Sequence, residues 1–110
     1  MPFIQLSINR EISKKQETAL KTGLGTLITE IDGKTEKGLM LDFRGNSNMW
    51  FAGGNEDPAV FLHVMLYGNA DKDDCKRFSE KSIGLIKDVM DIEDSHIYVK
   101  FDETLNFYWG

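Results

Sequence analysis

The sequence predicts an α+β domain in which two β-α-β units form one four-stranded mixed sheet with both helices on one face. Segments with apolar residues at every second position alternate with segments in which they recur every three or four residues, as strands and helices require. The order strand–helix–strand occurs twice, with similar lengths, within 110 residues. A crossover helix implies that the two strands of each unit are parallel. Residues 1–110 are expected to form a single domain.

The first unit contains a strand, a helix and a second strand. Residues 3–8 alternate as a strand, and the helix is expected to begin at Ser13, since Gln16 stands at capping-box spacing. The apolar residues of this helix share one face: Leu20, Leu24, Leu27, Ile28 and Ile31. Gly33 is expected to end the helix as a left-handed cap. The second strand is predicted at residues 39–43.

The second unit repeats this order. Residues 45–48 have the composition of a turn, and residues 49–51 form a short segment after it. A strand is expected at residues 60–67, and the acidic residues 71–74 mark the start of a helix, whose dipole favours negative charge there. The inward side of this helix carries Phe78, Ser82, Ile83, Ile86, Val89 and Met90. The last strand is predicted at residues 96–101.

The second face of the predicted sheet is too aromatic to be left in water and too polar for an ordinary core. Its residues are Phe3, Gln5, Ser7, Met40, Asp42, Arg44, Phe61, His63, Met65, Tyr67, Tyr98 and Lys100. Large mixed patches of this kind usually mark an interface, so other subunits are expected to cover it. A half-solvated open sheet is the alternative.

Composition excludes several classes of function. The net charge of −5 argues against binding nucleic acid or an anionic membrane surface. One cysteine, Cys75, permits no internal disulfide, and the N-terminus lacks the pattern of a signal peptide, so a cytoplasmic protein is expected, with secretion by another route left open. Neither His63 nor His96 has a carboxylate or thiol at metal-ligand spacing, so no metal site is predicted.

Pro2 is the candidate catalytic base. Removal of Met1 turns its nitrogen into a free secondary amine, which accepts a proton from carbon if its pKa is lowered towards neutrality. Apolar surroundings lower such a pKa by disfavouring the cation. Phe3 and Ile4 beside it, together with Trp50 and Phe51, are candidates for those surroundings.

Lys34 is the second candidate. It follows Gly33 at the predicted end of the first helix, where its cation is placed to hold a substrate carboxylate. The competing interpretation is a helix-terminal lysine that only complements the helix dipole, and from spacing alone that is the commoner case.

These positions together resemble the macrophage migration inhibitory factor family of the tautomerase superfamily, over essentially the whole chain. The matching segments are Met1-Pro2-Phe3-Ile4, Gly33-Lys34, Met49 to Gly54 with Pro58, Tyr67-Gly68, Ile97-Tyr98-Val99 and Trp109. The resemblance implies a homotrimer with active sites between subunits, no cofactor, and keto–enol tautomerase activity on an acid such as phenylpyruvate. It leaves a dopachrome-like substrate open.

The resemblance also implies roles for individual residues. Pro2 would abstract and return the proton, and Lys34 would bind the substrate carboxylate with help from the backbone N–H of Tyr67. Tyr98 of a neighbouring subunit would contact the substrate ring. The expected pocket walls are Met40, Phe107 and Trp109.

The chain departs from the family pattern at several positions. Thr35 stands where proline is usual, which leaves the loop after Lys34 less rigid, and no Cys-x-x-Cys pair is present. Lys100 stands where an asparagine contacts substrate in vertebrate members. It either adds a second cation to the site or forms an ion pair with Asp42 or Asp102, and the ion pair is favoured.

Three functions remain open from the sequence. The first is the tautomerase itself. The second is a cytokine-like interaction protein that binds a host or receptor protein, with tautomerase activity incidental. The third is another reaction of the superfamily, such as hydration, dehalogenation or decarboxylation. That chemistry needs an additional acid or arginine near Pro2, and the first half of the chain offers only Arg10 and Arg44.

Overall fold

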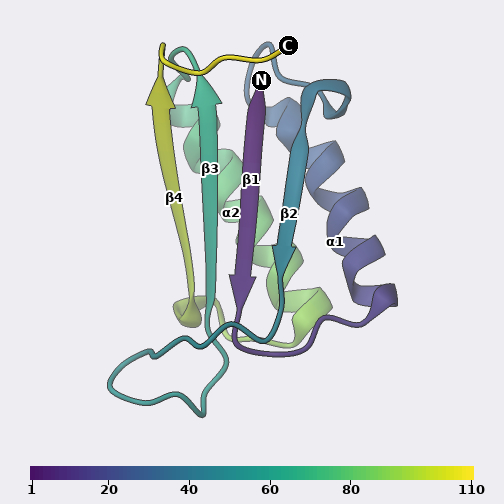
Figure 1. The fold of residues 1–110 in the computed structure, drawn as a ribbon, viewed down its shortest axis with the longest axis vertical. Helices are drawn as coiled ribbons and strands as arrows, with labels where there is room; N and C mark the ends of the chain where they lie inside the picture. Colours follow the sequence, from purple (N-terminus) through teal and green to yellow (C-terminus); the bar gives the residue numbers. More distant parts are fainter.

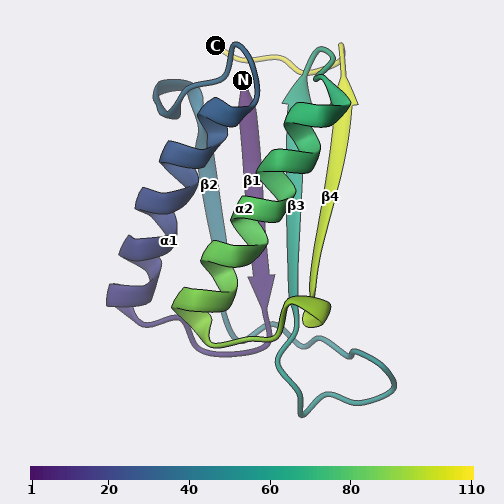
Figure 2. The same ribbon diagram turned by 180° about the vertical axis from the view of Figure 1, so that it is seen from behind.

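The computed structural model describes residues 1–110 as one four-stranded sheet with both helices packed on the same face (Figures 1 and 2). The strands and helices, in chain order, are β1 (Pro2–Ile8), α1 (Lys14–Leu27), β2 (Met40–Arg44), β3 (Val60–Tyr67), α2 (Lys72–Met90) and β4 (Ile97–Thr104). Three short 3₁₀ helices occupy Ile28–Glu30, Glu36–Gly38 and Asp94–His96. The predicted α+β architecture is confirmed, with each strand boundary within a few residues of its expected position.

The strand order is β2-β1-β3-β4, which places the first strand of each unit at the centre of the sheet. β1 and β2 are parallel, as are β3 and β4, and β1 joins β3 in antiparallel pairing. The sheet is therefore mixed, as predicted. The antiparallel register aligns Pro2 with Leu66 and Ile8 with Val60, so that the chain begins where β3 ends.

The core lies between the sheet and the two helices. Its central side chains come from alternate positions of β1 and β3, as period-2 patterning requires. Ile4, Leu6, Leu62 and Val64 are each at most 1% exposed. Phe78 of α2 is fully buried, and its ring meets that of Phe101 edge-on with 5.8 Å between ring centroids. Burying a side chain of this size contributes about 1.5–3 kcal/mol.

The start of α1 agrees with the prediction, but its end does not. The Ser13 hydroxyl accepts a hydrogen bond from the Gln16 backbone N–H at 3.1 Å, and the Gln16 side chain accepts one from the Ser13 N–H at 2.9 Å. The helix stops at Leu27, and a 3₁₀ turn follows it, earlier than the expected end at Gly33. This tighter turn directs Ile31 into the core, where it is 1% exposed. Gly33 is left-handed, with φ of 81°, but in the turn beyond the helix.

The second face of the sheet is open in the single chain. Met40 and Tyr98 on this face are 67% and 60% exposed. Lys100 forms its ion pair with Asp102 at 2.9 Å and not with Asp42, whose partner is Arg44. The side chains of the predicted mixed patch thus share one face, as the alternation indicated.

The segment between β2 and β3 forms a long loop that projects beyond the sheet at the end opposite the N-terminus (Figure 1). Phe51 anchors part of it, with its ring 4.8 Å from that of His96 and 5.7 Å from that of Tyr98, measured between centroids. The His96 ring also contacts the Pro58 carbonyl oxygen at 2.9 Å. Both chain termini lie at the other end of the sheet (Figures 1 and 2).

Candidate active site

Pro2 is the first residue of β1, a central strand of the sheet. Proline has no N–H for a strand ladder, and the first residue of a strand is one of the few places in a sheet that accepts it. Its neighbours across the sheet are Leu66 on β3 and, one position along, Met40 and Met65 opposite Phe3. Pro2 is buried, and Gly38 lies close to it, since a Cβ added at Gly38 would stand 4.0 Å from Pro2 Cδ and 3.7 Å from Met1 Sδ.

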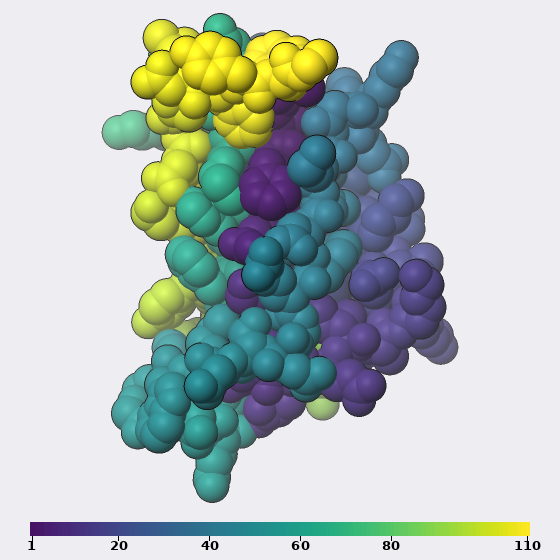
Figure 3. All heavy atoms as spheres, in the orientation of Figure 1, coloured from purple at the N-terminus to yellow at the C-terminus, as the bar shows by residue number.

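A cavity of about 590 Å³ opens beside Pro2. It is lined by 11 residues, seven of them hydrophobic, and the full set is Met1, Pro2, Phe3, Gly38, Met40, Met65, Asn106, Phe107, Tyr108, Trp109 and Gly110. The last residues of the chain turn back after β4 and cross the end of the sheet, where they lie against the N-terminus (Figure 3). The cavity is therefore built from both ends of the chain.

Aromatic side chains form one wall of this cavity. Met40, Phe107 and Trp109, the expected pocket walls, all line it. The Trp109 ring meets that of Tyr67 edge-on at 5.3 Å, and the Phe107 ring lies 6.5 Å from Trp109, measured between centroids. No sequence pattern pointed to Met65, Asn106 or Tyr108, because their place depends on strand register and on the path of the C-terminal segment.

Lys34 does not line the cavity, but its charge acts on the amino group of Met1, which does. Its backbone N–H donates to the Ile31 carbonyl at 3.0 Å, closing the turn after the 3₁₀ helix. Its Nζ donates to the carbonyl oxygen of Tyr67 at 3.0 Å. The interpretation as a lysine that serves only the helix dipole does not fit this position, since α1 ends at Leu27 and the side chain reaches β3.

Met1 lines the cavity and also contacts the end of β3. The carbonyl oxygen of Met1 accepts a hydrogen bond from the Tyr67 backbone N–H at 3.3 Å. This N–H is the donor that the resemblance assigns to substrate binding. Burial, followed by the charge of Lys34, lowers the pKa of the Met1 amino group. An amine at this end of β1 is thus in surroundings that disfavour its protonated form.

Several candidate residues do not line this cavity in the single chain: Ile4, Lys34, Trp50, Phe51, Tyr67, Tyr98 and Lys100. Trp50 and Phe51, candidates for the surroundings of Pro2, instead line a separate pocket with Phe61, His96 and Tyr98 at the opposite end of the sheet. The loop after β2 carries them there, away from Pro2. Tyr98 pairs with Phe61, and Lys100 with His63 in mid-strand, whereas Pro2 pairs with Leu66.

The structure describes the whole chain, and little in it supports metal-dependent or thiol chemistry. No three His, Cys, Asp or Glu side chains come together in a way that would hold a metal ion. Burial, and then the charges of Glu103, Asp74 and Asp71, raise the pKa of the Cys75 thiol, which keeps it protonated and unreactive. Neither helix combines the length and the apolar character needed to cross a bilayer.

Similar proteins share this fold. The crystal structure of MIF2 from Leishmania major matches with a TM-score of 0.91 and 24% sequence identity. The aligned region covers 99% of this chain and 93% of the Leishmania chain. A macrophage migration inhibitory factor homologue from Prochlorococcus marinus matches with a TM-score of 0.79 and 24% sequence identity, and the aligned region covers 98% of this chain and 93% of the homologue. N1, a member of the cis-3-chloroacrylic acid dehalogenase family, matches with a TM-score of 0.77 and 20% sequence identity, and the aligned region covers 92% of this chain and 73% of N1.

At these identities the structural likeness establishes the fold alone, and no curated protein sequence matches the chain. The family assignment comes from the sequence, of which residues 1–107 match the family described as Macrophage migration inhibitory factor (MIF). This match spans β1 to β4 and most of the cavity wall. The chain therefore belongs to the macrophage migration inhibitory factor family, which has the tautomerase fold.

Proposed function

We propose that the protein is a keto–enol tautomerase acting on aryl 2-oxo acids such as phenylpyruvate, with the Pro2 nitrogen as base after removal of Met1. The observation that carries the proposal is the position of Pro2. It is buried beside an apolar cavity, and a cation and a backbone donor, Lys34 and Tyr67, lie within reach of the residue that precedes it. The reaction needs no cofactor.

The proposed chemistry is one proton transfer in each direction. The free amine of Pro2 takes a proton from the carbon next to the substrate carbonyl. The electron pair of that C–H bond forms the C=C bond, and the π pair of the carbonyl moves to its oxygen, giving the enolate. The protonated Pro2 amine then returns its proton to the enolate oxygen, which gives the enol and restores the free amine, and the reverse sequence regenerates the ketone. Apolar walls such as Phe3 and Phe107 favour the neutral amine.

Met1 supports the assignment of the anion-binding groups. Its carbonyl oxygen occupies the Tyr67 N–H, and its amino group lies close enough to Lys34 to be affected by that charge. Removal of Met1 frees the Tyr67 N–H, which lies close to Lys34 because the Lys34 Nζ donates to the carbonyl of the same residue. A substrate carboxylate placed there meets one cation and one backbone N–H, and such preorganised donors stabilise developing negative charge.

The cavity composition favours tautomerisation over the other reactions of the superfamily. None of its lining residues carries an acidic, basic or imidazole side chain. Arg44 pairs with Asp42 at the other end of β2, and Arg10 donates to the Asn9 carbonyl at 2.9 Å in the loop after β1. Neither arginine is beside Pro2, so the additional acid or cation that hydration or dehalogenation requires is missing from this chain's cavity.

We further propose a homotrimer whose subunits cover the open sheet faces. Tyr98 is 60% exposed in the single chain, an unusual exposure for a large aromatic on a strand. A neighbouring subunit would bring Tyr98 and Lys100 towards another subunit's Pro2. Sedimentation equilibrium of the purified protein tests this assembly, and a monomer at micromolar concentration contradicts it.

The test of the activity combines intact-mass measurement with an ultraviolet assay of phenylpyruvate enol conversion. Protein that has lost Met1 is expected to be active, and Pro2→Gly to lose most of the activity. A matched control inserts one alanine after Met1, so that processing leaves Pro2 in an amide bond with the rest of the chain unchanged. This control is expected to be inactive, and activity equal to wild type would exclude Pro2 as the base.

The interaction protein is the second candidate that the resemblance supports. The same Pro2→Gly variant separates the two functions. A variant that loses turnover but keeps its affinity for a host or receptor protein indicates that binding is the main role. A processed wild-type protein that leaves enolisable 2-oxo acids unchanged removes the enzymatic proposal altogether.

A further inference from the structure

The Lys34 side chain projects from a short segment that has little regular structure of its own. After the 3₁₀ helix Ile28–Glu30, the chain makes a turn at Asp32 and the left-handed Gly33, and Lys34 follows. The next residue is Thr35, whose φ is not restricted as that of proline is. Contacts from outside the segment must therefore hold it in place.

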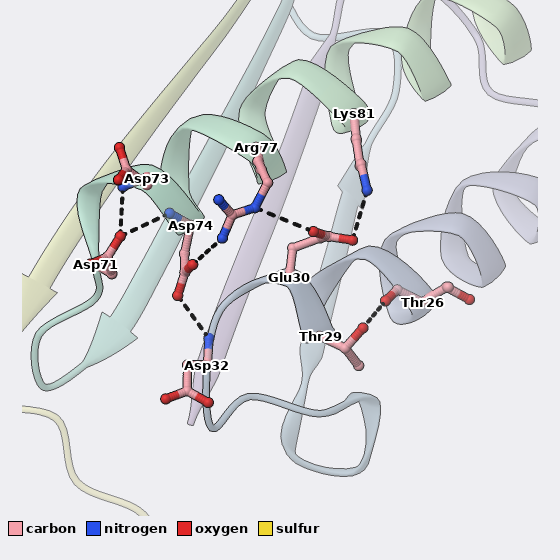
Figure 4. A network of polar contacts seen from close by, with 9 residues as sticks. All are labelled: Thr26, Thr29, Glu30, Asp32, Asp71, Asp73, Asp74, Arg77 and Lys81. Atoms are coloured by element: carbon pink, nitrogen blue, oxygen red, sulfur yellow. Dashed lines mark hydrogen bonds and ion pairs between the residues drawn. The ribbon is translucent and has the colours of Figure 1, made fainter.

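Those contacts come from the first turns of α2 (Figure 4). The Asp74 carboxylate accepts a hydrogen bond from the Asp32 backbone N–H at 3.2 Å through Oδ2, and its Oδ1 accepts one from Arg77. The Asp74 side chain is 14% exposed, less than any other carboxylate that forms an ion pair here. Its hydrogen bonds fix a backbone group two residues before Lys34.

The network continues to the other side of the same segment. The Arg77 Nε lies 3.7 Å from Glu30 Oε1, and Lys81 Nζ lies 2.9 Å from Glu30 Oε2 (Figure 4). The hydrogen bond from Lys81 lowers the pKa of Glu30, which keeps this carboxylate charged. Two turns of α2 thus hold residues 30 and 32 at once.

The start of α2 is itself fixed relative to Tyr67, the other partner of Lys34. The Asp71 side chain caps the helix by accepting hydrogen bonds from the backbone N–H groups of Asp73 and Asp74, at 2.8 and 3.2 Å. The Gly68 N–H donates to the Thr104 carbonyl at 2.9 Å, which holds the link between β3 and α2 against β4. Asp74 therefore has a fixed position relative to Tyr67, and its contact with the Asp32 amide holds the Lys34 segment in place.

We propose that Asp74 and Arg77 are positioning residues that set the location of the Lys34 ammonium group by holding the Asp32 backbone amide. This rests on the proposed function, in which Lys34 binds the substrate carboxylate. The pair acts on substrate binding and not on proton transfer by Pro2. The cationic partners in this network, Arg77 and Lys81, are about half exposed. Ion pairs with such exposed side chains contribute little to stability, so a purely structural role is a weak explanation of the network.

The test compares Asp74→Ala with Asp73→Ala, since both remove one acid from the first turn of α2. Only Asp74 contacts the Lys34 segment, whereas Asp73 contributes a backbone N–H to the cap. Asp74→Ala is expected to raise KM for phenylpyruvate by about three- to tenfold, the effect of one displaced charged hydrogen bond, with kcat nearly unchanged. Asp73→Ala is expected to leave both constants at the wild-type values.

Two further measurements distinguish positioning from general damage. The methyl ester of phenylpyruvate lacks the carboxylate, so its KM is expected to be the same in Asp74→Ala and wild type. In a Lys34→Ala background, Asp74→Ala is expected to add no further increase in KM, because the two changes act through one group. An equal loss on acid and ester, or additive effects of the two substitutions, contradicts the proposal.

Thermal unfolding of each variant accompanies the kinetics. If Asp74→Ala does not fold, Arg77→Gln carries the same expectations, because it removes the partner that holds the Asp74 carboxylate. If Lys34→Ala raises KM and neither α2 variant does, the positioning proposal alone is wrong. If processed wild-type protein has no turnover, the proposed function is wrong and the positioning role fails with it. If wild type turns over but Lys34→Ala leaves KM unchanged, the role of Lys34 is wrong and the positioning role fails, while Pro2 as base is unaffected.

Discussion

The Lys34 Nζ donates a hydrogen bond to the Tyr67 carbonyl oxygen at 3.0 Å, and this contact joins the turn after α1 to the last residue of β3. The two residues are 33 positions apart in the chain. The N–H of Tyr67 points to the same end of the sheet, where it contacts the Met1 carbonyl at 3.3 Å. One residue of β3 therefore positions a cation through its carbonyl and offers a donor through its amide.

Replacing Lys34 is expected to weaken substrate binding. Lys34→Ala removes the cation, and kcat/KM for phenylpyruvate should fall by about ten- to a hundredfold, the range for losing a charged hydrogen bond. Lys34→Arg keeps the charge and should retain more activity than Lys34→Ala. Steady-state kinetics of the three proteins measure this, and equal values for alanine and wild type would contradict a role for the cation.

The pH dependence of kcat/KM reports on the Pro2 amine. A base acts in its unprotonated form, so activity should rise with pH and level off above the pKa of Pro2. Burial and the neighbouring Lys34 lower the pKa of the Met1 amino group, and we expect the Pro2 amine to be in the same surroundings once Met1 has been removed. The midpoint is therefore expected below about 7.7, the lower end of the ordinary α-amino range. A midpoint at or above that value contradicts the desolvated base.

Trp109 is expected to govern the preference for aromatic substrates. Its ring lines the cavity and packs edge-on against Tyr67. Trp109→Ala should raise KM for phenylpyruvate by about three- to tenfold, the worth of one aromatic contact, and should affect a short alkyl 2-oxo acid less. Trp109→Phe keeps a ring and serves as the control. The same KM increase for both substrates would show that the ring does not contact the aryl group.

The capping box of α1 makes a prediction about stability alone. Ser13→Ala removes the side-chain acceptor of the Gln16 N–H and should lower the free energy of unfolding by about 1 kcal/mol. Urea denaturation measures the difference. Ser95→Ala, an exposed serine without a helix to cap, should change stability by less than about 0.5 kcal/mol. Equal effects of the two substitutions would mean that the cap contributes nothing.

Asp102 should make stability depend on pH in the acid range. The hydrogen bond from Lys100, and then that from His63, lowers the pKa of its carboxyl group in the folded chain. A lowered folded-state pKa gives stabilisation that is complete above the unfolded value, about 3.9, and is lost as pH falls through the folded value.

Asp102→Asn should therefore be less stable than wild type at neutral pH, and the difference should shrink below about pH 3.9. Denaturation at one fixed protein concentration measures it, because assembly also contributes to stability. Asp88→Asn, on the exposed side of α2, is the control. A difference from wild type that stays constant down to low pH would rule out the carboxylate as its source.

Local patterns in the sequence were sufficient for the architecture. Alternation at residues 3–8 and 60–67 predicted strands whose core-facing side chains are now seen to be buried. The spacing of Ser13 and Gln16 predicted the start of α1. These signals succeed because each depends only on neighbours within a few residues and on which side of an element faces water.

Predictions that depended on long-range packing were less successful. The apolar stripe continues through Ile31, so the end of α1 was expected too late, although tighter 3₁₀ geometry serves the same burial. Trp50 and Phe51 were assigned to Pro2, but the loop between β2 and β3 takes them to the other end of the sheet. A loop's path is set by its tertiary contacts, and composition does not report it.

By itself the sequence determined the two β-α-β units, the chemistry available at Pro2 and Lys34, and the mixed character of the open sheet face. Only the tertiary structure decided which residues surround Pro2 and what holds Lys34 in place. Strand register aligned Pro2 with the end of β3, and the C-terminal segment closed the cavity wall. Side chains far apart in the chain become neighbours only when the sheet and helices pack. No local sequence pattern therefore predicts their contacts, such as that of Asp74 with the Asp32 amide.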